Sequence, residues 1–206
     1  MKKKIKASLD RKKSILLLGP RQTGKTTVLS QFSFDMSINL MRPKLRQRYE
    51  RDPSVLEAEI KALGVTECPP LIFIDEIQKV PELLDEIQVL VDEKLAVFVL
   101  TGSSARKIRK QSSQVNLLPG RLVSLRLDPL SLSESQPKDI EFALMYGALP
   151  GIIQVKIDSE REEDLRSYVE TYLEEEIRAE AEVRDLGKFG RFLELASVES
   201  GNIINF

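Results

Sequence analysis

The chain of 206 residues contains no histidine and no tryptophan, and it has a single cysteine, Cys68. The absence of histidine excludes catalytic triads, acid–base steps and metal sites that depend on an imidazole. One cysteine can form neither a disulfide within the chain nor a zinc site with several thiolates. Any chemistry that the protein performs therefore has to use carboxylates, lysine, arginine, hydroxyl groups or a bound metal ion.

Long apolar runs are also missing, since none reaches the roughly 18 residues that a membrane helix needs. The basic start of the chain is followed by an apolar stretch at residues 14–19, as in a signal peptide, but this stretch is too short and leads directly into a glycine-rich motif. We therefore interpret it as a strand and expect a cytoplasmic protein with no membrane segment. Hydrophobic residues make up 42% of the chain and charged residues 31%, which suits one globular α/β domain with a small addition.

The net charge of −1 hides an uneven distribution of charge along the chain. Residues 1–13 carry seven Lys or Arg against one Asp, and residues 158–185 carry twelve Asp or Glu against four Arg. The simpler interpretation of the basic start is a solvated helix or chain end. Binding of DNA or of an acidic partner is the alternative, although no extended basic face accompanies it.

Short apolar runs alternate with amphipathic segments over the first two thirds of the chain. This pattern predicts strands near residues 14–19, 34–40, 71–75, 96–104 and 121–127, with helices between them. Continuous apolar strands separated by helices favour a parallel sheet with helices on both faces. Beyond Pro129 the pattern becomes helical. We therefore divide the chain into a core, residues 1–130, and a helical lid or connector, residues 131–206.

The segment GPRQTGKT, residues 19–26, matches the phosphate-binding pattern Gly-x4-Gly-Lys-Thr between a predicted strand and a predicted helix. Its glycines allow a tight turn that brings backbone N–H groups against phosphate oxygens. Lys25 is expected to contact the β- and γ-phosphates, and the Thr26 hydroxyl to bind Mg²⁺. The predicted nucleotide-binding residues are Gly19, Pro20, Arg21, Gln22, Thr23, Gly24, Lys25, Thr26 and Thr27.

Two carboxylates, Asp75 and Glu76, follow the apolar strand LIFI. We expect Asp75 to bind the magnesium shell and Glu76 to orient and polarise an attacking water. A solvated turn with two acidic residues is the alternative. An Asp-Glu pair suits hydrolysis, whereas a small-molecule kinase has to keep water away from the γ-phosphate.

Hydroxyl residues end the strand in FVLTGSSAR, and polar side chains at this end of a parallel strand face the ligand crevice. Thr101 and Ser103 are therefore predicted to sense the γ-phosphate or to position its water, with Ser104 as a further candidate. Capping of the next helix by Ser103 or Ser104 is the alternative, and the two roles are compatible.

An arginine usually neutralises charge in the transition state of phosphoryl transfer, and it comes from the same chain or from a neighbour. The candidates are Arg21, Arg106, Arg109 and Arg121. Arg121 is our preferred candidate because the sequence PGR places it just before a predicted core strand, near a subunit or lid edge.

Seven motifs together carry a resemblance to a known family. They are GPRQTGKTT, LIFIDEIQKVPELLDEIQ, FVLTGSSARKIRK, NLLPGRL, LDPLSLSE, YGALPG and YLEEEIRAE, in this order. The set closely resembles the prokaryotic AAA-type P-loop ATPases of the AAA_14/DUF4143 family, which are similar to STAND and archaeal ATPases. The resemblance spans residues 10–206. It implies an ASCE-class P-loop core with an extra strand between the phosphate-loop strand and the magnesium strand, ATP and Mg²⁺ as ligands, and the roles given above for Lys25, Thr26, Asp75 and Glu76.

Members of that family usually continue after ESGNIINF into a helix-turn-helix-like piece and a region similar to restriction endonucleases. The resemblance therefore implies that the C-terminal output domain, the DUF4143 region, is missing here. We expect Mg²⁺-dependent ATP binding and hydrolysis, coupled to an unidentified partner or C-terminal domain, and an assembly of several copies of the chain. The alternative is a nucleotide-dependent switch or binding module with negligible turnover.

Overall fold

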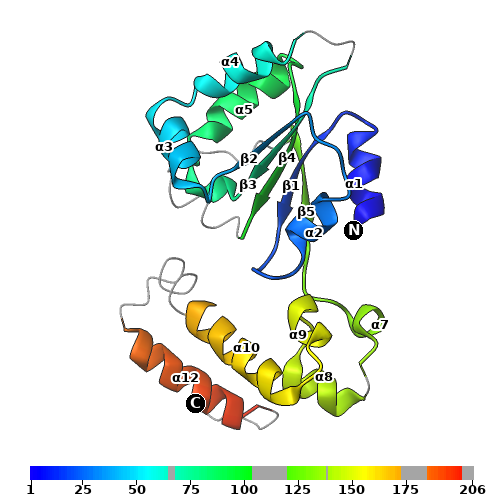
Figure 1. Ribbon diagram of the computed structural model, residues 1–206, viewed down its shortest axis with the longest axis vertical. Coiled ribbons are helices and arrows are strands. Elements are labelled where there is room, and N and C mark those ends of the chain that lie inside the picture. The colour runs from blue at the N-terminus through cyan, green and yellow to red at the C-terminus, as the bar shows by residue number, and fades with distance from the viewer. Residues whose placement is uncertain (65–67, 104–119, 138, 173–184, 201–206) are drawn as a thin grey trace. The chain divides into compact units, whose positions relative to one another are not determined.

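The computed structural model describes residues 1–64, 68–103, 120–137, 139–172 and 185–200 (Figure 1). The chain divides into two compact units, Met1–Gln136 and Pro137–Phe206. The boundary between them falls a few residues beyond the one expected from the sequence.

The first unit is built on a five-stranded sheet in the order β2-β3-β4-β1-β5, in which every neighbouring pair is parallel. The strands are β1 (Ser14–Leu18), β2 (Met36–Asn39), β3 (Leu71–Asp75), β4 (Val97–Gly102) and β5 (Leu122–Arg126). The predicted parallel sheet of five strands is confirmed. Strand β4 lies between β1 and β3, so the extra strand implied by the family resemblance is confirmed as well.

Helices cover both faces of this sheet, as the sequence predicts (Figure 1). On one face lie α3 (Pro43–Arg51), α4 (Val55–Ala62) and α5 (Leu83–Asp92), and on the other lie α1 (Lys2–Leu9) and α2 (Lys25–Leu29). Because side chains alternate along a strand, β1 contributes to both cores: Leu16 packs under α3–α5, while Ile15 and Leu17 pack with α1 and α2. Burial on both sides explains why the strand sequences are continuous apolar runs.

The basic start of the chain forms α1, whose Ile5 and Ser8 are buried. The lysines at positions 2, 3, 4 and 6 are exposed. The helix therefore rests on the sheet through one stripe and presents its positive charges to solvent. Among the described residues, no helix is both long enough and apolar enough to span a membrane.

The elements that follow β5 are helical: α7 (Leu132–Ser135), α8 (Ile140–Tyr146), α9 (Pro150–Gln154), α10 (Asp158–Tyr172) and α12 (Leu186–Val198). The second unit has a small core of Tyr146, Leu149 and Ile152. Arg161 is buried beside it, with its guanidinium 4.7 Å from the ring centre of Phe142 and 4.6 Å from that of Tyr146. The Arg161 side chain of α10 thus contacts two rings of α8 and donates a hydrogen bond to the Val155 carbonyl at the end of α9. It therefore joins the three helices.

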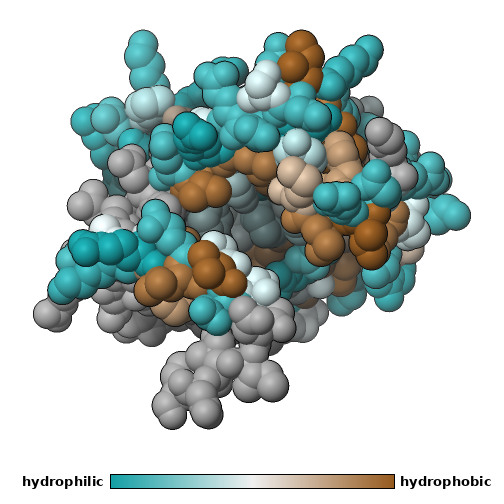
Figure 2. Space-filling model, turned by 90° about the horizontal axis from the view of Figure 1, so that it is seen from below, coloured by the Kyte–Doolittle hydropathy of each residue, from teal (hydrophilic) through white to brown (hydrophobic). Residues whose placement is uncertain are grey.

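Large hydrophobic side chains remain exposed in the second unit. On the face drawn in Figure 2, hydrophobic residues form separate groups among hydrophilic ones. The most exposed large hydrophobic residues of α8 and α12 are Ile140, Leu144, Met145, Leu195 and Val198. Among the described residues, the helical unit therefore buries a smaller share of its apolar side chains than the sheet unit does.

Candidate active site

The strand register brings the predicted motifs to one edge of the sheet. Leu18, the last residue of β1, lies opposite Gly102 of β4, and the last residue of β3, Asp75, lies opposite Asn39 of β2. Because all strands are parallel, the loop that follows β1 meets the carboxyl ends of β3 and β4 at the same edge. A hydrogen bond of 3.3 Å from Gly19 N to the Gly102 carbonyl connects the start of the loop to β4.

The two glycines of the loop serve different purposes. Gly24 has φ 89°, a left-handed conformation that glycine adopts without strain, and it immediately precedes α2. At Gly19 an added Cβ would lie 2.1 Å from the Leu127 carbonyl oxygen, which is far too close. Gly19 is therefore required by close packing against the end of β5, a constraint that the motif alone does not indicate.

Lys25 lies inside the loop, with only 8% of its surface exposed. Its Nζ donates to the carbonyls of Gly19 and Pro20, each at 2.7 Å. The Thr23 hydroxyl donates to the same Pro20 carbonyl at 2.9 Å. The loop thus folds around a positive charge, while Thr26 and Thr27 at the start of α2 are exposed. A buried cation inside a glycine-rich loop is suited to binding a phosphate group.

Thr101 joins the two carboxylate residues. It is fully buried, its hydroxyl donates to Asp75 Oδ1, and it accepts a hydrogen bond of 3.1 Å from the Glu76 backbone N–H. Glu76 itself has φ 61° and ψ 47°, a left-handed conformation that is unusual for a residue with a side chain. The structure therefore brings Asp75, Glu76 and Thr101 together, and it keeps Glu76 in a backbone conformation that costs energy.

Gln78 is a residue that the sequence analysis missed. It lies in the short 3-10 helix η1 (Ile77–Lys79) directly after the carboxylates and is only 4% exposed. Its Nε2 donates to Glu76 Oε2 and, at 3.4 Å, to the hydroxyl of Ser103 at the end of β4. The sequence shows only a polar residue two positions after Glu76, and its burial becomes evident in the structure alone.

Arg121 lies away from the loop of its own chain. It precedes β5, whose first residue pairs with Ser14 at the start of β1, so it belongs to the amino edge of the sheet. Its Nε and one terminal nitrogen bind the two carboxylate oxygens of Asp92 at 2.6 and 2.9 Å. This bond lowers the pKa of Asp92 and raises that of Arg121. The candidates Ser104, Arg106 and Arg109 lie outside the described residues.

A cavity of about 360 Å³ adjoins the phosphate loop at Thr26. Its lining combines the rings of Phe34 and Phe73, which stack with centres 5.1 Å apart, with polar residues that include Asn39 and Arg42. The cavity therefore extends the accessible surface of the site from α2 toward the edge strand β2.

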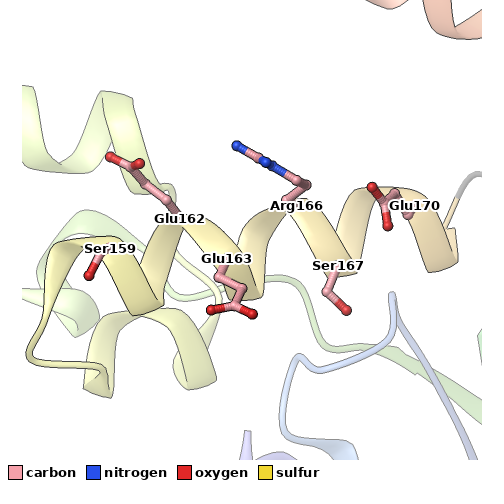
Figure 3. A pocket seen from close by; sticks show the side chains of 6 residues that line it. All are labelled: Ser159, Glu162, Glu163, Arg166, Ser167 and Glu170. Atoms are coloured by element: carbon pink, nitrogen blue, oxygen red, sulfur yellow. The ribbon is translucent and has the colours of Figure 1, made fainter.

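A second cavity, of about 480 Å³, belongs to the helical unit (Figure 3). Its described lining residues all come from α10, where Glu162 and Arg166 project to one side and Glu163 and Ser167 to the other (Figure 3). None of the predicted site residues that the structure describes is among them.

The donors at the site fit a magnesium ion only in combination with a nucleotide. Within the described parts of the chain, no three Asp, Glu or Cys side chains lie close enough together to hold a metal ion. Thr26 and Asp75 supply one hydroxyl and one carboxylate, and a bound triphosphate would have to supply further oxygens. This requirement matches the way in which phosphate-loop proteins hold Mg²⁺.

Residues 11–136 match the family model AAA_14, described as an AAA domain. Residues 137–206 match a different model, DUF8612, described as a domain of unknown function. The resemblance named the AAA_14/DUF4143 family and implied that the DUF4143 region is missing. The comparison shows the AAA domain but not DUF4143, and the residues that we expected to form a helical lid or connector match DUF8612.

Two curated relatives are uncharacterised proteins of Mycobacterium bovis and Mycobacterium tuberculosis, each 26% identical over 176 residues. The match covers 84% of this chain and 38% of each relative, so the chain spans well under half of their length.

Among solved structures, PCH-2 of C. elegans is 18% identical with a TM-score of 0.42, over 60% of this chain and 37% of that one. The Aeropyrum pernix ORC1 protein in complex with DNA is 16% identical with a TM-score of 0.48, over 94% and 74%. Both scores lie below 0.5, too low a likeness to support a functional argument.

Proposed function

We propose, from the premise that the chain belongs to the AAA domain family AAA_14 and is thus a nucleotide-binding P-loop domain, that it binds ATP with Mg²⁺ and hydrolyses the γ-phosphate. One observation carries the proposal. The loop that encloses Lys25 lies at the same sheet edge as Asp75 and Glu76, and Thr101 bonds to both of these acidic residues. Phosphate binding and water activation require that these groups lie close enough together to contact the same bound nucleotide.

Binding begins with residues 19–26. Their backbone N–H groups and the Lys25 ammonium bind the phosphates, and Arg21, Gln22 and Thr27 line the approach. In the structure the Lys25 Nζ donates to two carbonyls, each at 2.7 Å. Phosphate oxygens replace these neutral acceptors with charged ones, which form stronger hydrogen bonds.

Thr26 and Asp75 would hold Mg²⁺ together with phosphate oxygens. When bound, the ion supplies positive charge that offsets the charge developing on the phosphate oxygens. Thr101 donates to Asp75 Oδ1, which fixes the orientation of that carboxylate.

Glu76 acts on the attacking water. The water oxygen forms a bond to the γ-phosphorus while the bond from that phosphorus to the bridging oxygen of ADP breaks. The Glu76 carboxylate orients the water and accepts its proton, and the products are ADP and inorganic phosphate. Thr101 and Ser103, at the end of β4, respond to the presence of the γ-phosphate.

Arg121 completes the site of a neighbouring copy in this proposal. Within one chain it belongs to the opposite edge of the sheet, bound to Asp92. About a third of its side chain is exposed, so it is accessible to another subunit. Full turnover then requires an assembly in which the amino edge of one chain faces the phosphate loop of the next.

The second candidate function is a nucleotide-dependent switch with negligible turnover. It is favoured by the distance of Arg121 from the loop of its own chain, because a single copy then lacks this charge at the site. In either case we propose that the nucleotide state is coupled to a partner or to a further part of a longer protein.

DNA is a candidate partner through the exposed lysines of α1. If this partner is correct, affinity for duplex DNA falls steeply as the salt concentration rises. Affinity that is absent or independent of salt removes DNA from the proposal.

Phosphate release from Mg-ATP, measured over a range of protein concentrations with Glu76→Gln in parallel, tests the proposal. We expect turnover that rises more than linearly with protein concentration and falls at least about 100-fold in the variant, because a glutamine amide does not accept the water's proton. Equal turnover in the two proteins would exclude Glu76 as the base. ATP binding without turnover at any concentration would establish the switch.

The role of Arg121 has its own test. Lys25→Ala removes the phosphate contact and Arg121→Ala removes the proposed finger, so each protein alone is expected to be inactive. In a mixture, a Lys25→Ala chain can offer its arginine to the intact loop of an Arg121→Ala chain, and part of the turnover returns. A mixture as inactive as its components would rule out Arg121 as a contribution from the neighbouring subunit.

A further inference from the structure

Gln78 combines three features that a structural role does not explain together. Its side chain is almost completely buried. Its amide nitrogen donates to the Glu76 carboxylate and faces Ser103 at 3.4 Å. Its amide oxygen, Oε1, is buried without a hydrogen-bond partner among the residues that the structure describes.

The unsatisfied oxygen makes Gln78 costly for stability. A buried acceptor with no donor loses its hydration without compensation, whereas an apolar side chain of the same shape avoids this loss. Turning the amide over would bring its oxygen against the Glu76 carboxylate, where two acceptors repel each other. The donor can therefore reach Glu76 only in an orientation that leaves Oε1 unsatisfied.

Glu76 shows the second cost at the same place. Its backbone is held in the left-handed region at φ 61°, and its N–H is bound by Thr101. Both the backbone and the side chain of Glu76 are thus fixed to residues at the end of β4, the backbone through Thr101 and the side chain through Gln78 and Ser103. Neighbouring costs of this kind persist where the geometry itself is needed.

We propose that Gln78 is a positioning residue that holds the Glu76 carboxylate through Oε2, connects it to Ser103, the residue after β4, and leaves the other carboxylate oxygen for the attacking water. This inference rests on the proposed ATP hydrolysis at the same site. The orientation of the Glu76 carboxylate then depends on the end of β4, because the Gln78 amide nitrogen donates to both Glu76 and Ser103. Gln78 does not touch the nucleotide and acts only through Glu76.

Gln78→Met is the decisive variant, because methionine has a similar length and no polar atom that needs a partner. We expect kcat for ATP to fall about 10- to 100-fold, as for a misplaced catalytic group, while KM and the affinity for ATP stay within about twofold. The melting temperature is expected to stay the same or to rise, because the buried Oε1 is removed. Gln88→Met, the same change at a half-buried position of α5, is the matched control and should leave kcat unchanged.

A purely structural role gives the opposite pattern. An unchanged kcat, or a lower melting temperature with kcat and KM altered together, would overturn the proposal. If Gln78→Met does not fold, Gln78→Glu keeps the size and polarity of the side chain and replaces the donor by an acceptor. It should then lose kcat without losing affinity for ATP.

The failure of this inference can be distinguished from the failure of the proposed function. If the parent chain releases no phosphate, hydrolysis is wrong, and crystal structures of the parent and of Gln78→Met still decide the role of Gln78. A Glu76 carboxylate that changes its orientation in the variant supports positioning. A carboxylate that stays in the same place in both proteins contradicts it.

Discussion

The two edges of the central sheet treat their polar groups in different ways. At the amino edge the groups are matched locally: the Ser14 hydroxyl accepts a hydrogen bond of 3.0 Å from the Phe98 N–H, and Arg121 binds both carboxylate oxygens of Asp92. At the carboxyl edge Lys25 is buried among carbonyls, and Glu76 has a left-handed backbone. Both edges belong to the same five strands, so the strands themselves do not cause this difference.

The difference shows that the polar groups at the carboxyl edge of the sheet contribute less to stability than those at the amino edge. Groups at the amino edge are satisfied within the chain, and changes there that leave Arg121 in place are expected to affect stability alone. At the carboxyl edge the left-handed backbone of Glu76 costs stability, and such a cost persists where a ligand or a reaction needs the geometry. Changes there should therefore reduce function more than stability.

Among the variants that test this difference between the two edges, Lys25→Ala is expected to have the largest effect. Loss of a charge-assisted contact to the phosphates should lower the affinity for Mg-ATP about 10- to 100-fold, because hydrogen bonds to charged groups contribute about 1.5–3 kcal/mol. Titration calorimetry measures the affinity, and Lys44→Ala on the exposed side of α3 is the control. If the two variants bind ATP equally well, the carboxyl edge is not a phosphate site.

Thr101→Val comes next and affects both properties. The change keeps the shape of the buried side chain but removes the donor to Asp75 and leaves the Glu76 N–H without its acceptor. We expect the free energy of unfolding in urea to fall by about 1–3 kcal/mol and ATP turnover to fall with it. Thr101→Ser retains the hydroxyl and should preserve most of both. A valine variant as stable and active as the serine variant would contradict the role of this hydroxyl.

Asp92→Asn at the amino edge should have the smallest effect. Its partner Arg121 holds the pKa of Asp92 below its ordinary value, so the contribution of the bond to stability is present above about pH 3.9 and is lost as the pH falls through the lowered pKa. Both side chains are partly exposed, so this contribution is small. The melting temperatures of parent and variant should differ slightly at neutral pH and converge in acid, with ATP affinity unchanged. A gap that persists in acid would mean that another interaction of Asp92 causes it.

The sheet and the main motifs could be predicted from the sequence because their signals are local. Burial on both faces makes the strands continuous apolar runs, and the boundaries of β3, Leu71–Asp75, coincide with the run LIFID. The phosphate loop and the carboxylates Asp75 and Glu76 follow directly after strands. The order of parallel strands then brings them to one edge.

The remaining features of the site depend on contacts between distant parts of the chain. Arg121 pairs with Asp92 only because the end of α5 meets the start of β5, and the two residues are 29 positions apart. The orientation of the Gln78 amide follows from contact with Glu76 and with Ser103, 25 residues further on. Neither pairing leaves a periodic pattern in the sequence. The role of the helical unit as a lid stays a prediction.

The contact of Gly19 with the end of β5 has a mechanical consequence. Leu127 N–H donates to the Leu18 carbonyl at 2.8 Å, and the Leu127 carbonyl packs against Gly19 so closely that no side chain fits between them. From Leu127 the backbone leaves the sheet and continues through α7 to the second unit, which begins at Pro137. Gly19, the first residue of the phosphate loop, is therefore held directly against Leu127, where the connecting segment begins. We therefore expect any shift of the loop at Gly19 to displace Leu127 as well.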